Sequence, residues 1–299
     1  MRQTAARRRH SAFAAGLASL VMAMGFTAIP ADAAPQTKAE YVALGDSYTA
    51  GTGAGAAERP LGVDCWQSTP GYVNNVAKTG NVNLAANAAC HGAVLSRFSP
   101  FYDQVLLTPT VHEQIDSLVM DGRLSGDTDL VSITAGANDL GFAYVLGVCA
   151  FYSDIECQGA VAQATSGDSL ALLTGGLVQT YRTIRAVAPN SQITALGYPL
   201  LFDPNSSFAP LPAAKQMLIN QATLVVNSTI ANAAAAADVQ YVDVTGRFAG
   251  HEVNSSDPWL QLSPTDFTAD YNFHPTPEGH RAYAAGLLAA VKPGQLARR

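Results

Sequence analysis

A serine and a histidine near opposite ends of this chain are the residues best suited to chemistry. Ser47 follows an apolar run that stops at Gly45, which is typical of a buried parallel strand that delivers a side chain to a functional loop. His274 lies far downstream in an Asn-Phe-His-Pro segment. A serine hydroxyl is a weak nucleophile at neutral pH and needs a base to take its proton. We therefore expect Ser47 to be a nucleophile and His274 its general base, although a histidine there also suits a helix cap.

Two further positions are suited to stabilise the oxyanion that develops when a serine attacks a carbonyl carbon. Such a charge needs fixed hydrogen-bond donors. Asn138 follows another apolar run and offers its side-chain amide, while Gly92 lacks a Cβ and can bring its backbone N–H close to a ligand. With the N–H of Ser47 they form a candidate oxyanion hole. Taken singly, Asn138 also suits a turn and Gly92 a flexible loop.

The elements that must position these residues alternate between strand and helix. Short apolar runs predict five strands over residues 40–44, 82–86, 129–135, 192–197 and 239–244. Apolar periodicity, alanine content and capping signals predict helices over 111–119, 159–188 (one or two), 212–237 and 276–291. This alternation predicts an α/β fold with a parallel sheet. Because ligands bind at the carboxyl ends of such strands, Ser47, Gly92 and Asn138 should meet at one edge.

Several other residues invite a functional interpretation. The segments after Gly51, over 98–102 and over 142–151 are apolar or aromatic, and we expect them to be loops that either line an acyl groove or pack beneath one another. His91 adjoins Gly92 and either touches substrate or, as we favour, faces solvent. Asp46 is expected to brace its turn. No partner pattern surrounds the remaining histidines, which we expect to be structural or on the surface: His112, His251 and His280.

Residues 1–34 have the composition of a signal peptide. A basic start, a small apolar stretch and an Ala-rich end match such a segment, and the rival interpretation is an uncleaved anchor. We expect export by either the general or the twin-arginine route, a single domain over residues 35–299 and a secreted, extracellular monomer with no stable membrane anchor. The net charge of −6 and the lack of a basic stripe argue against nucleic acid or anionic membranes as partners.

Four cysteines fit an exported protein. Their even number favours disulfides, for which three pairings are possible. The sequential pairing, Cys65–Cys90 and Cys149–Cys157, is the most economical because each bond closes a short loop. No Cys-x-x-Cys or His-x-x-x-His spacing supports a metal site, so we expect no metal.

Together these motifs resemble the four blocks of the GDSL or SGNH hydrolase family. The matching segments, in the family's order, are Gly45-Asp46-Ser47-Tyr48, Gly92, Gly136-Ala137-Asn138-Asp139 and His274-Pro275. The chain is most similar to the secreted actinobacterial lipase/esterase branch. That resemblance implies a flavodoxin-like three-layer sandwich around a five-stranded parallel sheet and no cofactor. It also implies the roles given above for Ser47, His274, Gly92 and Asn138, and it supports the sequential disulfides.

One departure from the family concerns the group that orients His274. Much of the family carries an aspartate three residues before this histidine, but here that position is Tyr271 and the aspartate is Asp270. Either Asp270 reaches His274 through a shifted loop, or a backbone carbonyl of Tyr271 or Asn272 orients the imidazole. We favour the carbonyl, which fixes the tautomer but stabilises an imidazolium less than a carboxylate does.

The function expected from the sequence is hydrolysis of carboxylic esters through a Ser47 acyl-enzyme. Lipid or aliphatic acyl esters, such as triacylglycerols, are the favoured substrates. The alternatives are a carbohydrate acetyl-esterase on the same scaffold and a non-catalytic extracellular binding protein. The α/β-hydrolase fold is disfavoured because position 49 is Thr rather than the Gly of G-x-S-x-G, and because Ser47 follows the first strand.

Overall fold

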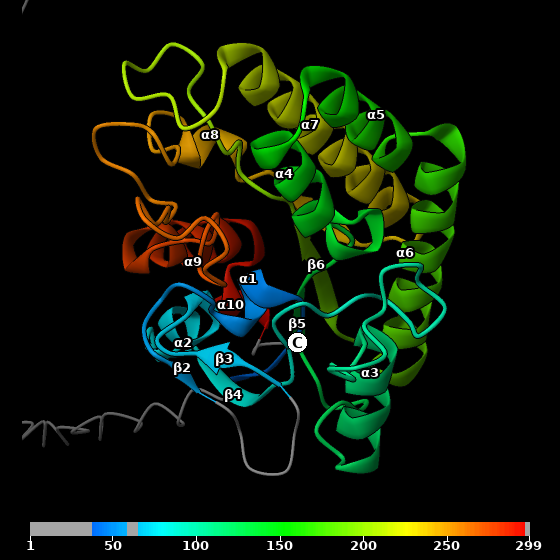
Figure 1. The fold of residues 1–299 in the computed structure, drawn as a ribbon. Coiled ribbons are helices and arrows are strands. Elements are labelled where there is room, and N and C mark those ends of the chain that lie inside the picture. Colours follow the sequence, from blue (N-terminus) through cyan, green and yellow to red (C-terminus); the bar gives the residue numbers. More distant parts are fainter. Residues whose placement is uncertain (1–37, 59–64, 297–299) are drawn as a thin grey trace, which may run out of the picture. The chain divides into compact units, whose positions relative to one another are not determined.

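Five parallel strands form the central sheet in the computed structural model (Figure 1). They are β1 (Ala39–Gly45), β4 (Val82–Asn87), β5 (Leu130–Thr134), β6 (Gln192–Leu196) and β7 (Gln240–Val242), arranged in the order β4-β1-β5-β6-β7. This is the flavodoxin-like order, with its switch point at β1. The structure describes residues 38–58 and 65–296, so the predicted signal peptide over 1–34 lies outside the described residues.

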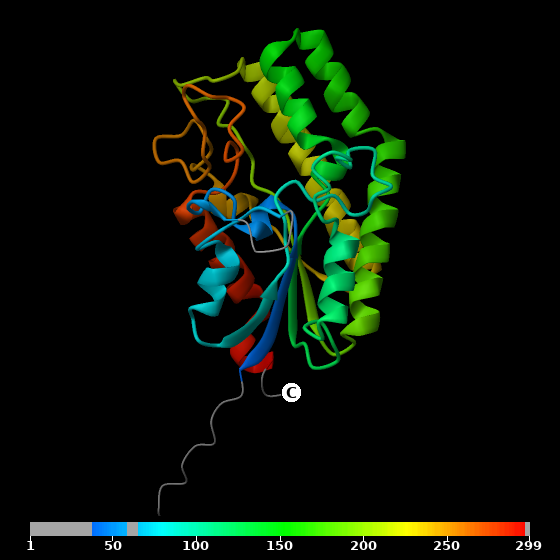
Figure 2. The ribbon, with the colours of Figure 1, turned by 60° about the horizontal axis from the view of Figure 1, so that its bottom comes forward.

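Helices cover both faces of the sheet (Figure 2). One face carries α2 (Tyr72–Ala77) and α9 (Pro277–Val291), which pack against each other; the other carries α3 (Val111–Met120), α6 (Gly167–Val187) and α7 (Ala213–Ala236). The other described elements are α1 (Ser47–Ala50), α4 (Phe142–Phe151), α5 (Asp154–Ala164), α8 (Thr245–Phe248), α10 (Pro293–Leu296), the 3₁₀ helix η1 (Asn138–Leu140) and an antiparallel ribbon of β2 (Ala57–Glu58) and β3 (Gln67–Ser68).

The predicted α/β sandwich is confirmed, with all five strands within two residues of their predicted positions. The strands were recognisable because burial on both faces makes them apolar runs; every residue of β5 is buried. The start of α9 also matches its sequence signal: Thr276 accepts a hydrogen bond from the backbone N–H of Gly279, and Pro277 occupies the first turn.

The segment over 142–151 differs from expectation. It was expected to be a loop, but it forms α4, which begins at the left-handed Gly141 (φ 70°). The apolar side chains of this helix lie on most of its faces, so its sequence shows no apolar stripe with a helical period. Helix α2 was also not predicted.

Both disulfides of the sequential pairing are present. Cys65–Cys90 ties the segment before β3 to the loop that carries Gly92, and Cys149–Cys157 joins α4 to α5. Both bonds therefore brace loops or helices near the carboxyl ends of the strands. Within residues 38–58 and 65–296, no helix has the length and apolar character needed to cross a membrane.

Candidate active site

The turn that carries Ser47 is fixed by close packing at Gly45. Gly45 has a φ of 129°, and a Cβ there would lie 2.1 Å from the carbonyl oxygen of Thr134, so only glycine fits. The buried amide of Gln114 holds the Gly45 peptide groups from the other side: its Oε1 accepts from Gly45 N (2.8 Å) and its Nε2 donates to Gly45 O (2.9 Å). Ser47 then begins α1 with its side chain at the carboxyl edge of the sheet.

Asp46 braces this turn from beneath, as expected. Its carboxylate is buried and accepts hydrogen bonds from the Tyr48 backbone N–H (3.0 Å), the Thr134 hydroxyl (2.6 Å) and the Tyr198 hydroxyl (2.5 Å). Burial raises the pKa of Asp46 to about 6, although these donors oppose the shift. Asp46 therefore holds β1, β5 and the segment after β6 together behind the serine.

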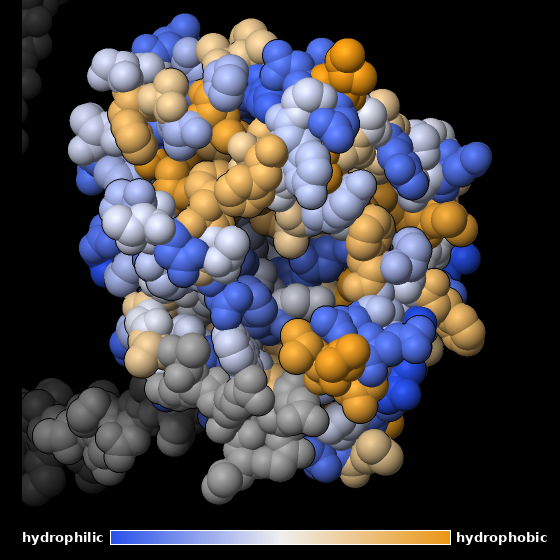
Figure 3. All heavy atoms as spheres, in the orientation of Figure 1, coloured by the Kyte–Doolittle hydropathy of each residue, from blue (hydrophilic) through white to orange (hydrophobic). Residues whose placement is uncertain are grey.

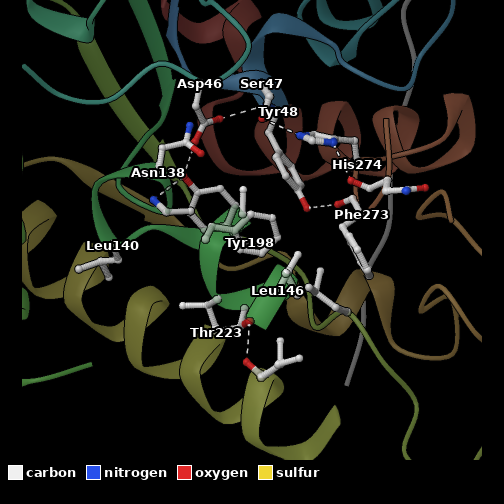
Figure 4. A pocket seen from close by; sticks show the side chains of 18 of the residues that line it. Asp46, Ser47, Tyr48, Asn138, Leu140, Leu146, Tyr198, Thr223, Phe273 and His274 are labelled. Atoms are coloured by element: carbon white, nitrogen blue, oxygen red, sulfur yellow. Dashed lines mark hydrogen bonds between the residues drawn. The ribbon is translucent and has the colours of Figure 1, made fainter. Parts of the chain in front are cut away.

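His274 faces Ser47 from the loop before α9. The distance from His274 Nε2 to Ser47 Oγ is 2.7 Å, and Nδ1 lies 2.9 Å from the carbonyl oxygen of Asn272 (Figure 4). A carbonyl oxygen only accepts hydrogen bonds, so Nδ1 carries the proton and Nε2 is free to accept from the serine hydroxyl. Burial lowers the pKa of His274 to about 3, with the nearby His91 adding to the shift. The neutral imidazole is thus set up as a base.

The loop that presents His274 is held by a second contact. Phe273 has a left-handed backbone (φ 62°), which is unfavourable for a bulky residue. The hydroxyl of Tyr48, the residue after Ser47, donates to the Phe273 carbonyl at 2.6 Å. This bond ties the serine turn directly to the histidine loop, so that the position of one side chain depends on the other.

Asp270 does not occupy the orienting position. The Nδ1 atom of His274 contacts Asn272 O instead, and Asp270 is exposed. Its negative charge acts on His91, whose pKa it raises against a larger lowering by burial. Of the two alternatives left open by the sequence, the geometry matches the backbone carbonyl, specifically that of Asn272 rather than Tyr271.

The proposed oxyanion-hole residues converge on the same cavity as Ser47 and His274. Gly92 (φ 77°) and Asn138 both line it. The Asn138 amide donates to the Ala93 carbonyl at 2.9 Å, which fixes the side chain against the loop that carries Gly92. Loops from β1, β4 and β5 thus meet at the carboxyl edge of the sheet, as the strand order requires.

The cavity extends from Ser47 into a largely apolar space of about 400 Å³. In the view of Figure 4, Ser47 and His274 lie at one end and Thr223 of α7 at the other. Its apolar walls come from η1 and α4, from α7 and from the loops after β6 and before α9: Leu140, Val145, Leu146, Ile219, Ala222, Val226, Leu201, Phe267 and Phe273. This volume lies in the usual range for small-molecule sites.

Even the hydroxyl-bearing wall residues present little polarity to this space. The Thr223 hydroxyl donates to the Ile219 carbonyl (3.1 Å), and the Thr165 hydroxyl donates to the Val161 carbonyl (2.8 Å). Each hydroxyl is therefore satisfied within or beside its own helix, and the far end of the cavity offers methyl groups rather than free donors.

Sequence reasoning found the polar end of this site but only part of its walls. Among the described residues of the three apolar segments singled out, those of 142–151 line the cavity, while 52–58 and 98–102 do not. The wall from α7 was missed, because apolar positions on a helix also indicate ordinary core packing. His91, favoured as solvent-facing, instead lies on the cavity wall with its ring 5.3 Å from that of His274.

All three of the other histidines have structural partners. His251 Nδ1 lies 2.7 Å from the Asp257 carbonyl oxygen, and its ring stacks on Trp259. The buried His280 accepts a hydrogen bond from Tyr72 N and donates to Thr52 O, and His112 lies 3.0 Å from the Thr180 hydroxyl.

A serine–histidine pair beside an apolar cavity points to the class of serine ester hydrolases, and a parallel α/β sandwich can carry such a site.

Comparison with known proteins places the chain within that class. It belongs to the GDSL-like lipase/acylhydrolase family, whose model matches residues 43–282, and it is a carboxylic ester hydrolase. It is 33% identical over 267 residues to Lipase 1 of Streptomyces coelicolor, and the alignment covers 88% of this chain and 92% of that relative. It is also 33% identical to a lipase of Streptomyces rimosus, covering 89% of this chain and 92% of that relative.

Solved structures agree with this assignment. The extracellular lipase of Streptomyces rimosus is similar with a TM-score of 0.70 and 30% identity, covering 85% of this chain and 100% of that one. Phospholipase A1 of Streptomyces albidoflavus is similar with a TM-score of 0.71 and 31% identity, covering 85% and 99%. The expected fold and family are therefore confirmed.

Proposed function

We propose that this protein hydrolyses lipid or aliphatic acyl esters, such as triacylglycerols, with Ser47 as nucleophile and His274 as general base. One observation carries the proposal: Ser47 Oγ lies 2.7 Å from His274 Nε2, and both residues line an apolar cavity of about 400 Å³. The pair supplies the chemistry, and the cavity supplies a place for an acyl chain. The names of the relatives, lipases and a phospholipase A1, support the same substrate class.

The reaction divides into two acyl transfers. Ser47 Oγ attacks the ester carbonyl carbon while its proton passes to His274 Nε2, and the resulting oxyanion is bound by the N–H groups of Ser47 and Gly92 and the amide of Asn138. As the C–O bond breaks, His274 returns the proton to the departing alcohol, leaving an acyl-Ser47. Water then attacks this acyl group, again giving its proton to His274. The proton returns to Ser47 Oγ as the carboxylic acid is released.

The positive charge that His274 carries during this cycle is stabilised by the carbonyl dipole of Asn272 rather than by a carboxylate. Asn272 O accepts the Nδ1 proton and so holds the imidazole in one tautomer, while the carboxylate of Asp270 is exposed. We infer that the Asn272 carbonyl, not Asp270, completes the machinery. The positive charge on the imidazole forms transiently, beside the oxyanion that balances it.

A panel of nitrophenyl esters from acetate to palmitate tests the substrate class. We expect kcat/KM to peak at medium or long acyl chains, because each added methylene contacts the apolar wall. Activity confined to acetate would favour the carbohydrate acetyl-esterase instead. A folded protein that takes no label at Ser47 from a fluorophosphonate would refute the serine mechanism and leave the non-catalytic binding protein.

Location and assembly complete the proposal. We propose that the protein is secreted and acts as a monomer. The two disulfides support an oxidising compartment outside the cytoplasm. The mass of the protein recovered from culture medium would give the cleavage site near residue 34, and light scattering would give its oligomeric state.

A further inference from the structure

The loop between β4 and α3 exposes a cluster of large apolar side chains beside the candidate active site. Phe98, Val105, Leu106 and Leu107 are 97%, 88%, 64% and 51% exposed, and together we call them the apolar tip. Figure 3 shows hydrophobic atoms gathered in front of α3 on the face shown there. Three of these residues are consecutive in the sequence, and exposed apolar residues that gather in this way mark an interaction site more often than scattered single residues do.

The two ends of this loop are joined to each other by backbone hydrogen bonds. Backbone N–H groups of Val111 and His112 donate to the carbonyls of Val94 (2.9 Å) and Leu95 (3.1 Å), so the chain leaves and returns at one place. This is the geometry of an Ω-loop, a compact surface loop that often carries function. The loop lies on the side of the carboxyl ends of the strands in Figure 2.

A turn within the loop holds the aliphatic side chains outward. The Asp103 carboxylate accepts from the backbone N–H groups of Val105 (2.7 Å) and Leu106 (2.9 Å), and Leu107 N donates to Asp103 O (3.1 Å). Leu107 has a left-handed backbone (φ 48°), which costs energy in a leucine. The turn is therefore stabilised by polar bonds, while its apolar side chains remain half or more exposed.

The same loop is joined to the catalytic machinery. It starts at Gly92 and contacts the Asn138 segment twice more: the Asp139 carboxylate accepts from Leu95 N (3.1 Å), and the Phe101 ring packs on the backbone of Gly141. A Cβ at Gly141 would lie 2.4 Å from that ring, which shows how close the packing is. A surface that received the tip would thus lie next to the entrance to Ser47.

The charges of the loop favour an electrically neutral partner. Its one cation, Arg97, pairs with Glu113 (2.6 Å), and the carboxylate of Asp103 is taken up by the turn. No unpaired lysine or arginine lies between residues 92 and 110, a stretch that the structure describes completely. A polybasic attraction to anionic lipid is therefore missing, and apolar insertion is the contribution that remains.

We propose that the apolar tip inserts into the surface of neutral or zwitterionic lipid aggregates and holds the active site at that surface. The inference rests on the proposed function, since long-chain esters are the substrates that form such aggregates. Val105, Leu106 and Leu107 enter the apolar layer, Phe98 enters beside them, and the loop places Gly92 and Asn138 next to the lipid from which an acyl chain enters the cavity.

The test compares two double variants of the full mature chain. V105S/L106S removes two side chains of the tip. V119S/M120S makes the matched change at the exposed end of α3, which precedes β5 and so lies at the opposite edge of the sheet; these residues are 41% and 81% exposed. Binding is measured by co-sedimentation with phosphatidylcholine vesicles, and activity on a soluble butyrate ester and on a triacylglycerol emulsion.

We expect V105S/L106S to bind these vesicles about 10- to 100-fold more weakly, since each buried aliphatic side chain contributes on the order of a tenfold gain. Its activity on the emulsion should fall in parallel, while kcat/KM on the soluble butyrate stays within about twofold of the parent. V119S/M120S should match the parent in all three measurements.

Three results would overturn the inference. They are equal vesicle binding by V105S/L106S and the parent, binding that requires phosphatidylglycerol and disappears in salt, and self-association that V105S/L106S abolishes. Failure of the proposed function gives a different pattern: the parent then binds vesicles through the tip but hydrolyses no long-chain ester. The two hypotheses are therefore separable with the same three proteins.

Discussion

The orientation of the side chains near Ser47 is set more by hydrogen bonds to backbone groups than by charged partners. His274 receives its orientation from the carbonyl of Asn272, and the carbonyl of the next residue, Phe273, is held by the Tyr48 hydroxyl. Asp46 lies next to Ser47, but its carboxylate contacts donors that fix the turn. The carboxylate is thus part of the scaffold, and an uncharged oxygen has the place that an aspartate fills in a Ser-His-Asp triad.

The first prediction separates these roles by mutation. Ser47→Ala should abolish ester hydrolysis, whereas Asp270→Ala should keep most of it, because Asp270 is exposed and His274 Nδ1 contacts Asn272 O. The measurement is kcat/KM on a nitrophenyl ester, with thermal unfolding to show that both variants fold. A loss above about 10³-fold in a folded Asp270→Ala protein would show that the carboxylate orients the imidazole in solution.

The second prediction concerns the pH dependence of the reaction. His274 must be neutral to act as a base, and burial lowers its pKa below the ordinary value of 6.5, to about 3. Protonation, and with it the loss of activity, should therefore begin only at acid pH. In short assays with a soluble ester, the acid limb of kcat/KM should have its midpoint well below 6.5. A midpoint at or above 6.5 would mean that water reaches the imidazole of the free enzyme.

At the scale of elements, the proposed acyl site lies between helices that pack on the sheet. The sheet edge supplies Ser47, Gly92 and Asn138, while α4 and α7 supply the apolar walls. A hydrogen bond from Lys215 of α7 to the Cys149 carbonyl (3.0 Å) joins α7 to α4, and the Cys149–Cys157 bond joins α4 to α5. Residues on α7 should therefore set the acyl-chain length without touching the chemistry.

Ala222 offers the third prediction. Ala222→Phe places a ring in the apolar cavity, so kcat/KM for a palmitate ester should fall about tenfold or more while butyrate hydrolysis changes little. The control is Leu224→Phe on the same helix, where the side chain is 43% exposed and does not line the cavity. An equal loss on butyrate and palmitate would show that the variant disturbs the serine rather than the acyl site.

The sequence predicted the elements better than the cavity between them. Buried strands and the capped helix α9 have local signals, and so do residues such as Ser47 that follow an apolar run. The carbonyl of Asn272 has no such signal, because every residue carries one and only the folded loop aims it. Helix α4 lacks a one-sided apolar stripe that would have predicted it. The cavity walls on α4 and α7 are about seventy residues apart in the sequence, so only the tertiary structure shows that they face the same cavity.

Across the whole molecule, buried carboxyl groups and buried histidines have opposite effects on how the free energy of unfolding changes with pH. Burial raises the pKa of Asp46 and Asp139 to about 6, so the folded state takes up these protons more readily than the unfolded chain does, and acidification below pH 6 favours folding through them. Burial lowers the pKa of His280 to about 4 and that of His274 to about 3. The unfolded chain protonates these histidines first, so acidification through them favours unfolding.

His280 allows the last prediction to be tested away from the reacting atoms. Its Nδ1 accepts from Tyr72 N (3.3 Å) and its Nε2 donates to Thr52 O (3.0 Å), a pattern that only the neutral ring satisfies. Its stabilising contribution is complete above pH 6.5 and is lost as the pH falls toward 4, which amounts to about 3 kcal/mol over that interval. His280→Gln should lower the free energy of unfolding at pH 7 yet lose less of it at pH 4.5, as measured by urea titration.

Asp139→Asn supplies a control of opposite sign. It removes a carboxyl group that gains a proton more readily in the folded state, so the free energy of unfolding should fall more steeply on acidification than in the parent. If both variants keep the parent's slope between pH 6.5 and 4.5, neither group differs in proton affinity between the folded and unfolded chain. A change of the same sign in both would instead indicate a general weakening of the core, because linkage requires the two slopes to move in opposite directions.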